Sequence, residues 1–329
     1  MNNFSYLQAT KAKEATGAKR DDKSSAFIAG GTTLIDLMKL NVENHDQLID
    51  VNMLPFKGIE QGNDGLRIGA LERMSDVGEH KLVVDQYPAI SQSLLLAASA
   101  QLRNMASIGG NVLQRTRCPY FRDTAFPCNK REPGTGCPAK EGDNRNLAIL
   151  GTSDACIATS YPGDLSVALI ALDAVLTLEN AKGKQRRVPI TEFYRLPGKT
   201  PHIETVLEPD ELIVAVTVPK AEHARKSMYL KVRDRASYAY ALTSAAVGLD
   251  VQGGTIRSAR VALGGVGAQP WRSKEAEQML VGKPANEATF RAAAAAAVRG
   301  AQPYEHNAFK IEMVQNTLVR ALTEVAARG

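Results

Sequence analysis

Short apolar runs alternate with helical patterns along the first third of the chain. The apolar runs have the length of β-strands, and the helical pattern places apolar side chains three or four residues apart. Strands are predicted at residues 4–7, 26–28 and 45–52, with a short helix at 11–16. This alternation predicts a mixed α and β region.

A Gly-Gly turn separates the strand at 26–28 from a helical pattern at 34–40. Thr33, with Asp36 three residues later, predicts a capping box at the start of that helix. Glycines let the backbone approach a ligand closely, and the first N–H groups of a helix point towards it, so Gly30-Gly31 suits a pyrophosphate. The alternative is a strand-to-helix turn without a ligand, and a single Gly-Gly pair favours it.

A second Gly-Gly pair follows a hairpin and a longer helical pattern. The hairpin spans 57–71 and turns at 63–65, and the helical face runs over 88–105. The pair at Gly109-Gly110 is then expected to break the helical run. Two such turns in one domain favour a joint phosphate cradle, although neither a G-x-G-x-x-G fingerprint nor a P-loop occurs.

The rhythm of the chain changes at a polar segment, residues 220–227, which predicts a domain boundary. The elements predicted before it are a strand at 155–160, a helix at 165–174, a hairpin over 174–190 and an edge or terminal strand at 211–219, stopped by Pro219. Those predicted after it are an antiparallel meander of strands over 227–266 and helices at 273–280, 288–300 and 307–329. Strands followed by helices indicate an α+β domain.

All the cysteines lie in an irregular segment around and after the second glycine pair: Cys118, Cys128, Cys137 and Cys156. A long irregular segment inside a compact domain needs a function or a cross-link. Structural zinc sites bring ligands in pairs two to four residues apart, which these spacings lack. Four thiolates match one [4Fe-4S] cluster in number, and proline stiffens the chain after Cys118 and Cys137. The spacing leaves a cluster, a zinc ion, and free or disulfide-bonded thiols open.

Basic residues outnumber acidic ones in this cysteine segment. Between residues 115 and 145, seven lysines and arginines stand against four acidic residues. That excess would offset the negative charge of a four-thiolate cluster. A solvated face or a docking surface explains it equally well.

Composition narrows the class of protein. The length of 329 residues suits two or three domains, and 44% apolar with 23% charged residues is typical of a globular chain. The net charge is +5, but the basic residues are interspersed with acidic ones and form no run or aromatic ladder. This distribution argues against nucleic acid as a partner. We recognise no signal peptide and no membrane span, so we expect folding in the cytoplasm. Hydrolase motifs are missing too, which fits an electron carrier.

Several segments together resemble the FAD-binding subunits of the molybdenum hydroxylases, the family of xanthine dehydrogenase and aldehyde oxidoreductase. In chain order they are FIAGGTTLIDLMK, ASIGGNV, PGDLSVALIALDAVL, ETVLEPDELIVAVTVP, YLKVRDRASYAYALTSAAVGL and RVALGGVGAQPWR. Most of the family joins the second and third segments by a short connection, whereas residues 112–161 intervene here and hold the cysteines. This insertion resembles the flavin subunit of bacterial periplasmic aldehyde oxidoreductases, which binds an extra [4Fe-4S] cluster.

The resemblance implies a set of cofactor contacts. Two loops would bind the FAD pyrophosphate, the first formed by Ile28, Ala29, Gly30, Gly31, Thr32 and Thr33 and the second by Ala106, Ser107, Gly109, Gly110 and Asn111. Asp164 would contact the cofactor, Lys231 would lie near the flavin ring and Leu207 would pack against it. The cysteines at 118, 128, 137 and 156 would bind the [4Fe-4S] cluster. No side chain is expected to act as a catalytic acid, base or nucleophile.

The implied fold is α+β, with a two-lobed FAD-binding domain of the vanillyl-alcohol-oxidase type over 1–219 and a smaller C-terminal domain of the CO dehydrogenase flavoprotein type over 225–329. The implied partners form a heterotrimer with this chain: a large subunit with the molybdenum cofactor and a small subunit with [2Fe-2S] clusters. Electrons from an aldehyde would cross those clusters to FAD and leave to an external acceptor, and export with a partner would bring the protein to the periplasm. A self-sufficient flavoprotein oxidase and an iron–sulfur sensor that binds nucleic acid are the alternatives.

Overall fold

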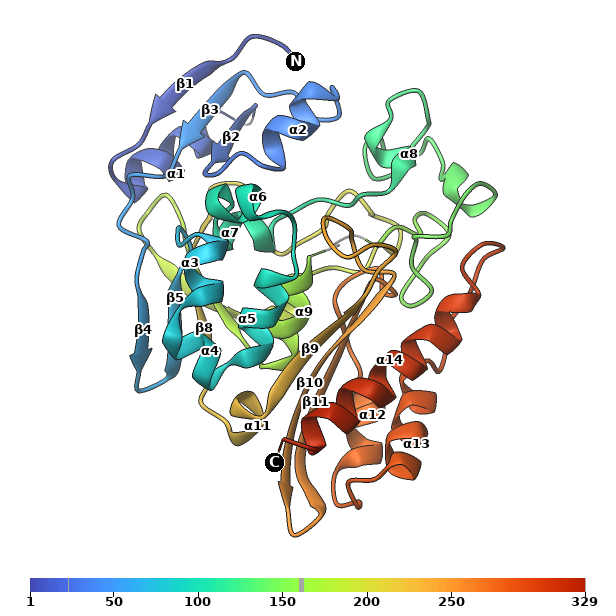
Figure 1. Cartoon of the computed structure of the whole chain (residues 1–329). Helices are drawn as coiled ribbons and strands as arrows, with labels where there is room; N and C mark the ends of the chain where they lie inside the picture. Colours follow the sequence, from blue (N-terminus) through green and yellow to red (C-terminus); the bar gives the residue numbers. More distant parts are fainter. Residues whose placement is uncertain (23, 160–162, 329) are drawn as a thin grey trace.

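The computed structural model describes residues 1–22, 24–159 and 163–328. These residues form three sheets, which follow one another along the chain (Figure 1). Among the described residues, no helix is both long enough and apolar enough to cross a bilayer.

A three-stranded parallel sheet with the order β1-β3-β2 forms the first lobe. Its elements are β1 (Ser5–Gln8), α1 (Ala12–Asp21), β2 (Ser25–Ile28), α2 (Leu34–Lys39) and β3 (Gln47–Asp50). Parallel strands need crossover connections, which the two helices provide. The predicted strands and helices are confirmed. The capping box is wrong, because Thr33 makes no side-chain cap hydrogen bond and Asp36 pairs with arginines of the cysteine segment instead.

A five-stranded antiparallel sheet with the order β4-β5-β8-β6-β7 forms the second lobe. Its strands are β4 (Ile59–Gly62), β5 (Gly65–Gly69), β6 (Val175–Glu179), β7 (Gln185–Pro189) and β8 (Leu212–Val218), with α10 (Ile190–Phe193) after β7. Both predicted hairpins are confirmed. The strand predicted at 211–219 as an edge or terminal strand is not an edge strand, since β8 lies inside the sheet and pairs with both β5 and β6, but it is the last strand before the polar segment at 220–227. Pro219 follows the strand and interrupts no ladder.

A layer of helices packs against this sheet (Figure 1). They are α3 (Met74–Glu79), α4 (Lys81–Gln86), α5 (Pro88–Leu95), α6 (Ala100–Met105), α7 (Ile108–Val112) and the fully buried α9 (Asp164–Ala171). The single helix predicted over 88–105 is wrong. Ala98 has a φ of +49°, which ends α5, and Ser99 starts α6 by accepting a hydrogen bond from the Leu102 N–H.

The second glycine pair lies inside a helix. The chain leaves helical geometry at Ala106 and Ser107, and Gly109-Gly110 then belong to α7. The prediction that this pair breaks the helical run is therefore wrong. Gly109 is packed tightly, because a Cβ added there would lie 3.1 Å from the Cβ of Ala70.

A four-stranded antiparallel sheet and three helices form the C-terminal part, as the meander and helix patterns predict. The strands, in the order β12-β11-β10-β9, are β9 (Ser227–Val232), β10 (Thr243–Gln252), β11 (Thr255–Gly264) and β12 (Trp271–Arg272). The helices are α12 (Lys274–Leu280), α13 (Glu287–Ala297) and α14 (Phe309–Ala326), and the short α11 (Glu222–Arg225) precedes the sheet. Their apolar faces build a core of their own.

The cysteine segment has little regular structure. It contains α8 (Pro119–Arg122) and a 3₁₀ turn at Pro138–Lys140. Residues 155–159 form no strand, so the strand predicted at 155–160 is wrong over these residues. Ser153 and Cys156 form one isolated β-bridge instead. Residues 160–162 lie outside the described part of the chain. The segment docks on α14, because the buried Lys310 ammonium donates to the Leu147 carbonyl at 3.0 Å.

Candidate functional site

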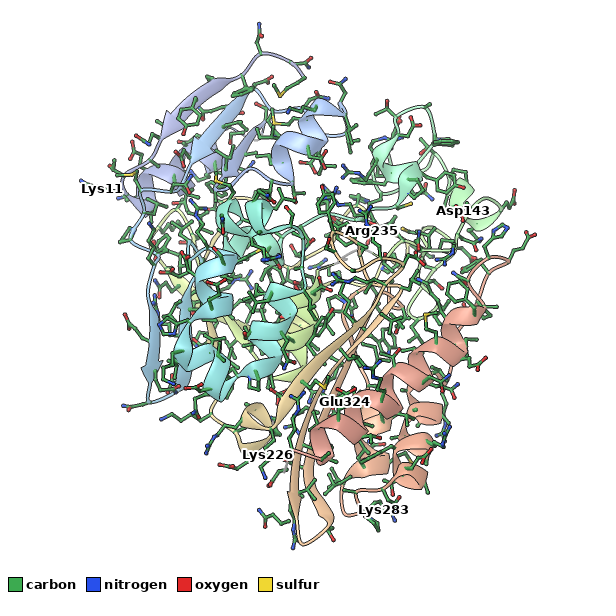
Figure 2. All side chains as sticks on the ribbon, viewed as in Figure 1. Lys11, Asp143, Lys226, Arg235, Lys283 and Glu324 are labelled. Carbon is green, nitrogen blue, oxygen red and sulfur yellow. The ribbon has the colours of Figure 1, made fainter. Side chains whose placement is uncertain are left out.

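Two adjoining cavities lie where the three parts of the chain meet. The smaller one has a volume of about 100 Å³ and borders the first lobe and α7. The larger one, of about 580 Å³, reaches β9 and the loop after it. Met74 and Asn111 line both, so the two cavities lie side by side. Arg235, labelled in Figure 2, lines the larger cavity and marks its place near the middle of the molecule.

The first glycine loop lines the smaller cavity with every residue from 28 to 33. Its backbone touches the second loop directly, since a Cβ added to Gly30 would lie 2.0 Å from the Met105 carbonyl oxygen. Gly31 has a φ of +69°, which favours glycine over any other residue. The structure thus brings together the two glycine loops that the sequence pairs as one cradle.

The second loop contributes Ala106, Ser107, Gly110 and Asn111 to the same cavity. Gly109 does not line it, because its N–H donates to the Ala70 carbonyl at 2.8 Å. Ser107 Oγ caps α7 by accepting a hydrogen bond from the Gly110 N–H at 3.2 Å. Asn111 Oδ1 is buried, and no described residue donates to it. A buried acceptor left unpaired costs about 1–3 kcal/mol, so this atom suits a hydroxyl or N–H of a ligand.

A buried ion pair lines the larger cavity. Lys231 Nζ donates to Asp164 Oδ2 at 2.8 Å, and the two side chains are 1% and 5% exposed. The Tyr229 hydroxyl donates to the other carboxylate oxygen at 2.5 Å. Burial raises the pKa of Asp164, and this desolvation outweighs the opposing effects of the Lys231 ammonium and the Tyr229 hydroxyl. Leu207 lines neither cavity and packs on the core of the second lobe, so its contact with a flavin ring stays a prediction.

The four cysteines, all free thiols, line one further space. Its volume is about 10 Å³, against about 100 and 580 Å³ for the two cavities above. Backbone N–H groups donate to three of the sulfurs: those of Tyr120 and Phe121 to Cys118, those of Ala139 and Ile157 to Cys137, and that of Ala158 to Cys156. Such donors stabilise thiolates, and in cluster proteins they help to set the reduction potential.

Burial favours the protonated thiol at three of these cysteines. Burial raises the pKa of Cys118 to about 12 and that of Cys156 to about 11, and it also raises the pKa of Cys137. Metal binding would have to displace these protons. In the described part of the chain, no three His, Cys, Asp or Glu side chains form a group that could hold a single metal ion. A mononuclear zinc site is therefore not supported.

Two residues of the cavities escaped the sequence analysis. Arg117 lines both cavities, donates to Asp36 Oδ2 at 3.0 Å and lies 5.2 Å from the centre of the Tyr240 ring. Its signals in the sequence were the excess of basic residues in the cysteine segment and its place beside Cys118, which lines both the cysteine space and the larger cavity. Tyr240 lies within a segment that carries the family resemblance, but nothing in the pattern singles it out.

Comparison with known proteins agrees with this geometry. Residues 2–221 match the family described as FAD binding domain in molybdopterin dehydrogenase. The chain belongs to the FAD-binding subunits of the molybdenum hydroxylases. Residues 228–325 match the CO dehydrogenase flavoprotein C-terminal domain, and together these matches confirm the predicted fold class.

Relatives of this flavin subunit extend over its whole length. The aldehyde oxidoreductase FAD-binding subunit PaoB of Escherichia coli is 47% identical over 331 residues and is covered completely, as is this chain. The glyceraldehyde dehydrogenase medium chain of Sulfolobus acidocaldarius is 26% identical over 98% of each chain. A chain of carbon monoxide dehydrogenase from Hydrogenophaga pseudoflava superposes with a TM-score of 0.78 at 25% identity, covering 99% of this chain and 98% of that one. The chain is thus an oxidoreductase subunit.

Proposed function

We propose that this flavin subunit carries electrons in a molybdenum-dependent aldehyde oxidoreductase. The observation that supports it most is the pair of adjoining cavities, of which both glycine loops line the smaller and the Asp164–Lys231 pair lines the larger. The likeness to PaoB, complete over both chains, favours an aldehyde as the substrate of the whole enzyme. Bound FAD would accept and donate electrons either in pairs or one at a time.

The residues of the cavity fit FAD by their chemistry. The close approach of Gly30 to Met105 leaves a cradle without side chains, which suits the two phosphates. Asn111 Oδ1 would accept a hydrogen bond from a hydroxyl of the cofactor. Lys231 would lie beside the flavin ring, and Asp164 would hold its side chain in place.

The four cysteines would hold a [4Fe-4S] cluster, which when bound would supply one-electron transfer or cross-link the insertion at 112–161. The shared space and the N–H groups directed at the sulfurs support this. Among the described residues, no group of three or more His, Cys, Asp or Glu side chains could hold a metal ion, so the proposal depends on the number of thiols and on the space that they share. Lys130, 2% exposed and bound to Glu204 at 2.8 Å, also lines this space.

The proposed partners are a large subunit with the molybdenum cofactor and a small subunit with [2Fe-2S] clusters. Several relatives are named as medium chains or as subunits of a complex, which supports an assembly of several chains. Electrons would enter from the small subunit and leave to an external acceptor. Export of the folded heterotrimer would place it in the periplasm. Within this chain, the FAD-binding domain would cover residues 1–219 and the C-terminal domain residues 225–329.

Purification of the native assembly through a tag on this chain tests the function. We expect stoichiometric FAD, and we expect anaerobic addition of an aldehyde to bleach the flavin absorbance of the assembly but not that of the isolated chain. Bleaching of the isolated chain would show a self-sufficient oxidase. A chain without flavin that binds nucleic acid with steep salt dependence would favour the sensor alternative.

Iron and sulfide analysis tests the cluster separately. We expect about four irons and four sulfides per chain. The variant Cys137→Ala should lose most of this iron, because three thiolates leave one iron without its protein ligand. Full iron content in this variant would exclude Cys137 as a ligand, and a chain with FAD but without iron would refute the cluster while leaving the flavin site intact.

A further inference from the structure

The smaller cavity contains a single charge. Glycines, threonines, apolar side chains and amides make up its lining, and among the described residues Arg117 is the only ionisable side chain of Asp, Glu, Lys, Arg or His on it. The donors that the glycine loops offer, which are N–H groups and hydroxyls, are all neutral. A diphosphate carries negative charge on both phosphates, and removing it from water is costly unless a cation pairs with it.

The guanidinium of Arg117 is held in place from two sides. Asp36 on α2 accepts its hydrogen bond at 3.0 Å, and the ring of Tyr240, which follows β9, lies 5.2 Å from it. The arginine itself belongs to the cysteine insertion, so three separate parts of the chain fix its position. Its side chain is 31% exposed, which leaves part of the guanidinium free to meet a ligand.

The carboxylate of Asp36 does not cancel the charge of Arg117. Arg122 on α8 binds the same oxygen at 2.5 Å, so two guanidinium groups share one carboxylate. One positive charge therefore remains in this group. Of the two arginines, only Arg117 lines the cavity.

We propose that Arg117 binds the diphosphate of FAD, so that the cysteine insertion supplies part of the flavin site. This inference rests on the proposed function, since it presumes that FAD occupies the cavity. The planar guanidinium suits a phosphate because it donates two parallel hydrogen bonds. The loops supply the shape of the cradle, and Arg117 supplies its charge.

A pair of matched variants of the full-length chain, freed of flavin, tests the proposal. Arg117→Gln removes the charge at the cavity, and Arg122→Gln removes the other partner of the same Asp36 carboxylate. We expect titration with FAD, followed by flavin fluorescence, to show affinity roughly 10- to 100-fold weaker for R117Q and within about threefold of wild type for R122Q. Equal losses in both variants would trace the effect to packing around Asp36 and overturn the proposal, as would unchanged affinity in R117Q.

Salt dependence of the wild-type chain gives a second readout that needs no variant. FAD affinity should fall as ionic strength rises, while the affinity for riboflavin, which has no phosphate, should stay constant. FAD affinity independent of salt would refute a role for a cation at the diphosphate. A wild-type chain that binds no FAD at all would refute the proposed function itself, which separates the two failures.

Discussion

Removal of Lys231 should destabilise the fold, because the buried carboxylate of Asp164 loses its cationic partner. In the native chain its ammonium lies 2.8 Å from Asp164 Oδ2, and both side chains are nearly inaccessible. Breaking a buried ion pair costs about 3–5 kcal/mol, because the remaining charge stays desolvated. The Tyr229 hydroxyl still donates to the carboxylate in the variant Lys231→Met. We therefore expect the loss in its free energy of unfolding to lie near the lower end of this range, at about 3 kcal/mol.

The double variant D164N/K231M is the matched control, because it removes both charges and keeps a side chain of similar size at each position. We expect it to be more stable than K231M alone, since no buried charge is left. Urea unfolding of the FAD-free chain at neutral pH measures wild type, D164N, K231M and the double variant, and flavin must be absent because a ligand adds its own stabilisation.

The pH dependence identifies the cause. Burial already raises the pKa of Asp164, and loss of the Lys231 ammonium removes the largest opposing effect. The folded variant then binds a proton that the unfolded chain releases, so the stability of K231M should fall as pH rises from the usual range of Asp towards the raised pKa, by up to about 1.4 kcal/mol per pH unit. The double variant lacks the titrating carboxylate and should not show this slope. A K231M penalty that is independent of pH, and equal in the D164N background, would refute the reasoning.

Three further predictions concern single residues elsewhere. Gly30→Ala should abolish FAD retention and lower the melting temperature, because its Cβ would lie 2.0 Å from the backbone oxygen of Met105, and flavin content with thermal unfolding measures both. Burial lowers the pKa of Lys310 to about 7, so between pH 7 and about 10.5 the unfolded chain binds a proton that the folded chain does not. The free energy of unfolding of wild type, measured with urea, should therefore rise by roughly 3–5 kcal/mol over this range of pH, and that of K310M should stay flat. If the proposed cluster is present, Lys130→Met should lower its midpoint potential in an EPR-monitored redox titration, because the change removes a cation that lowers the pKa of Cys156. An unchanged potential would contradict this electrostatic role.

Local patterns predicted most of the regular elements. The two hairpins and the C-terminal meander follow from alternating apolar residues and from glycine turns between them, which act over a few residues. The glycine loop at 28–33 was equally readable, because strand, glycines and helix follow one another directly. The wrong predictions concern positions where a contact with a distant segment determines the local structure. The carboxylate of Asp36 was expected to cap its own helix, but arginines of the insertion bind it instead.

Sequence alone determined the family, the glycine loops and the number of thiols, because these are properties of residue identity and short-range order. Tertiary structure decided which of these residues meet. It placed β8 inside its sheet, split the helix at 88–105, paired Asp164 with Lys231 and gathered four cysteines around one space. It also put Arg117 on the smaller cavity, between Asp36 and Tyr240. Such contacts join positions far apart in the chain, and packing of the whole molecule selects them, so no local pattern could predict them.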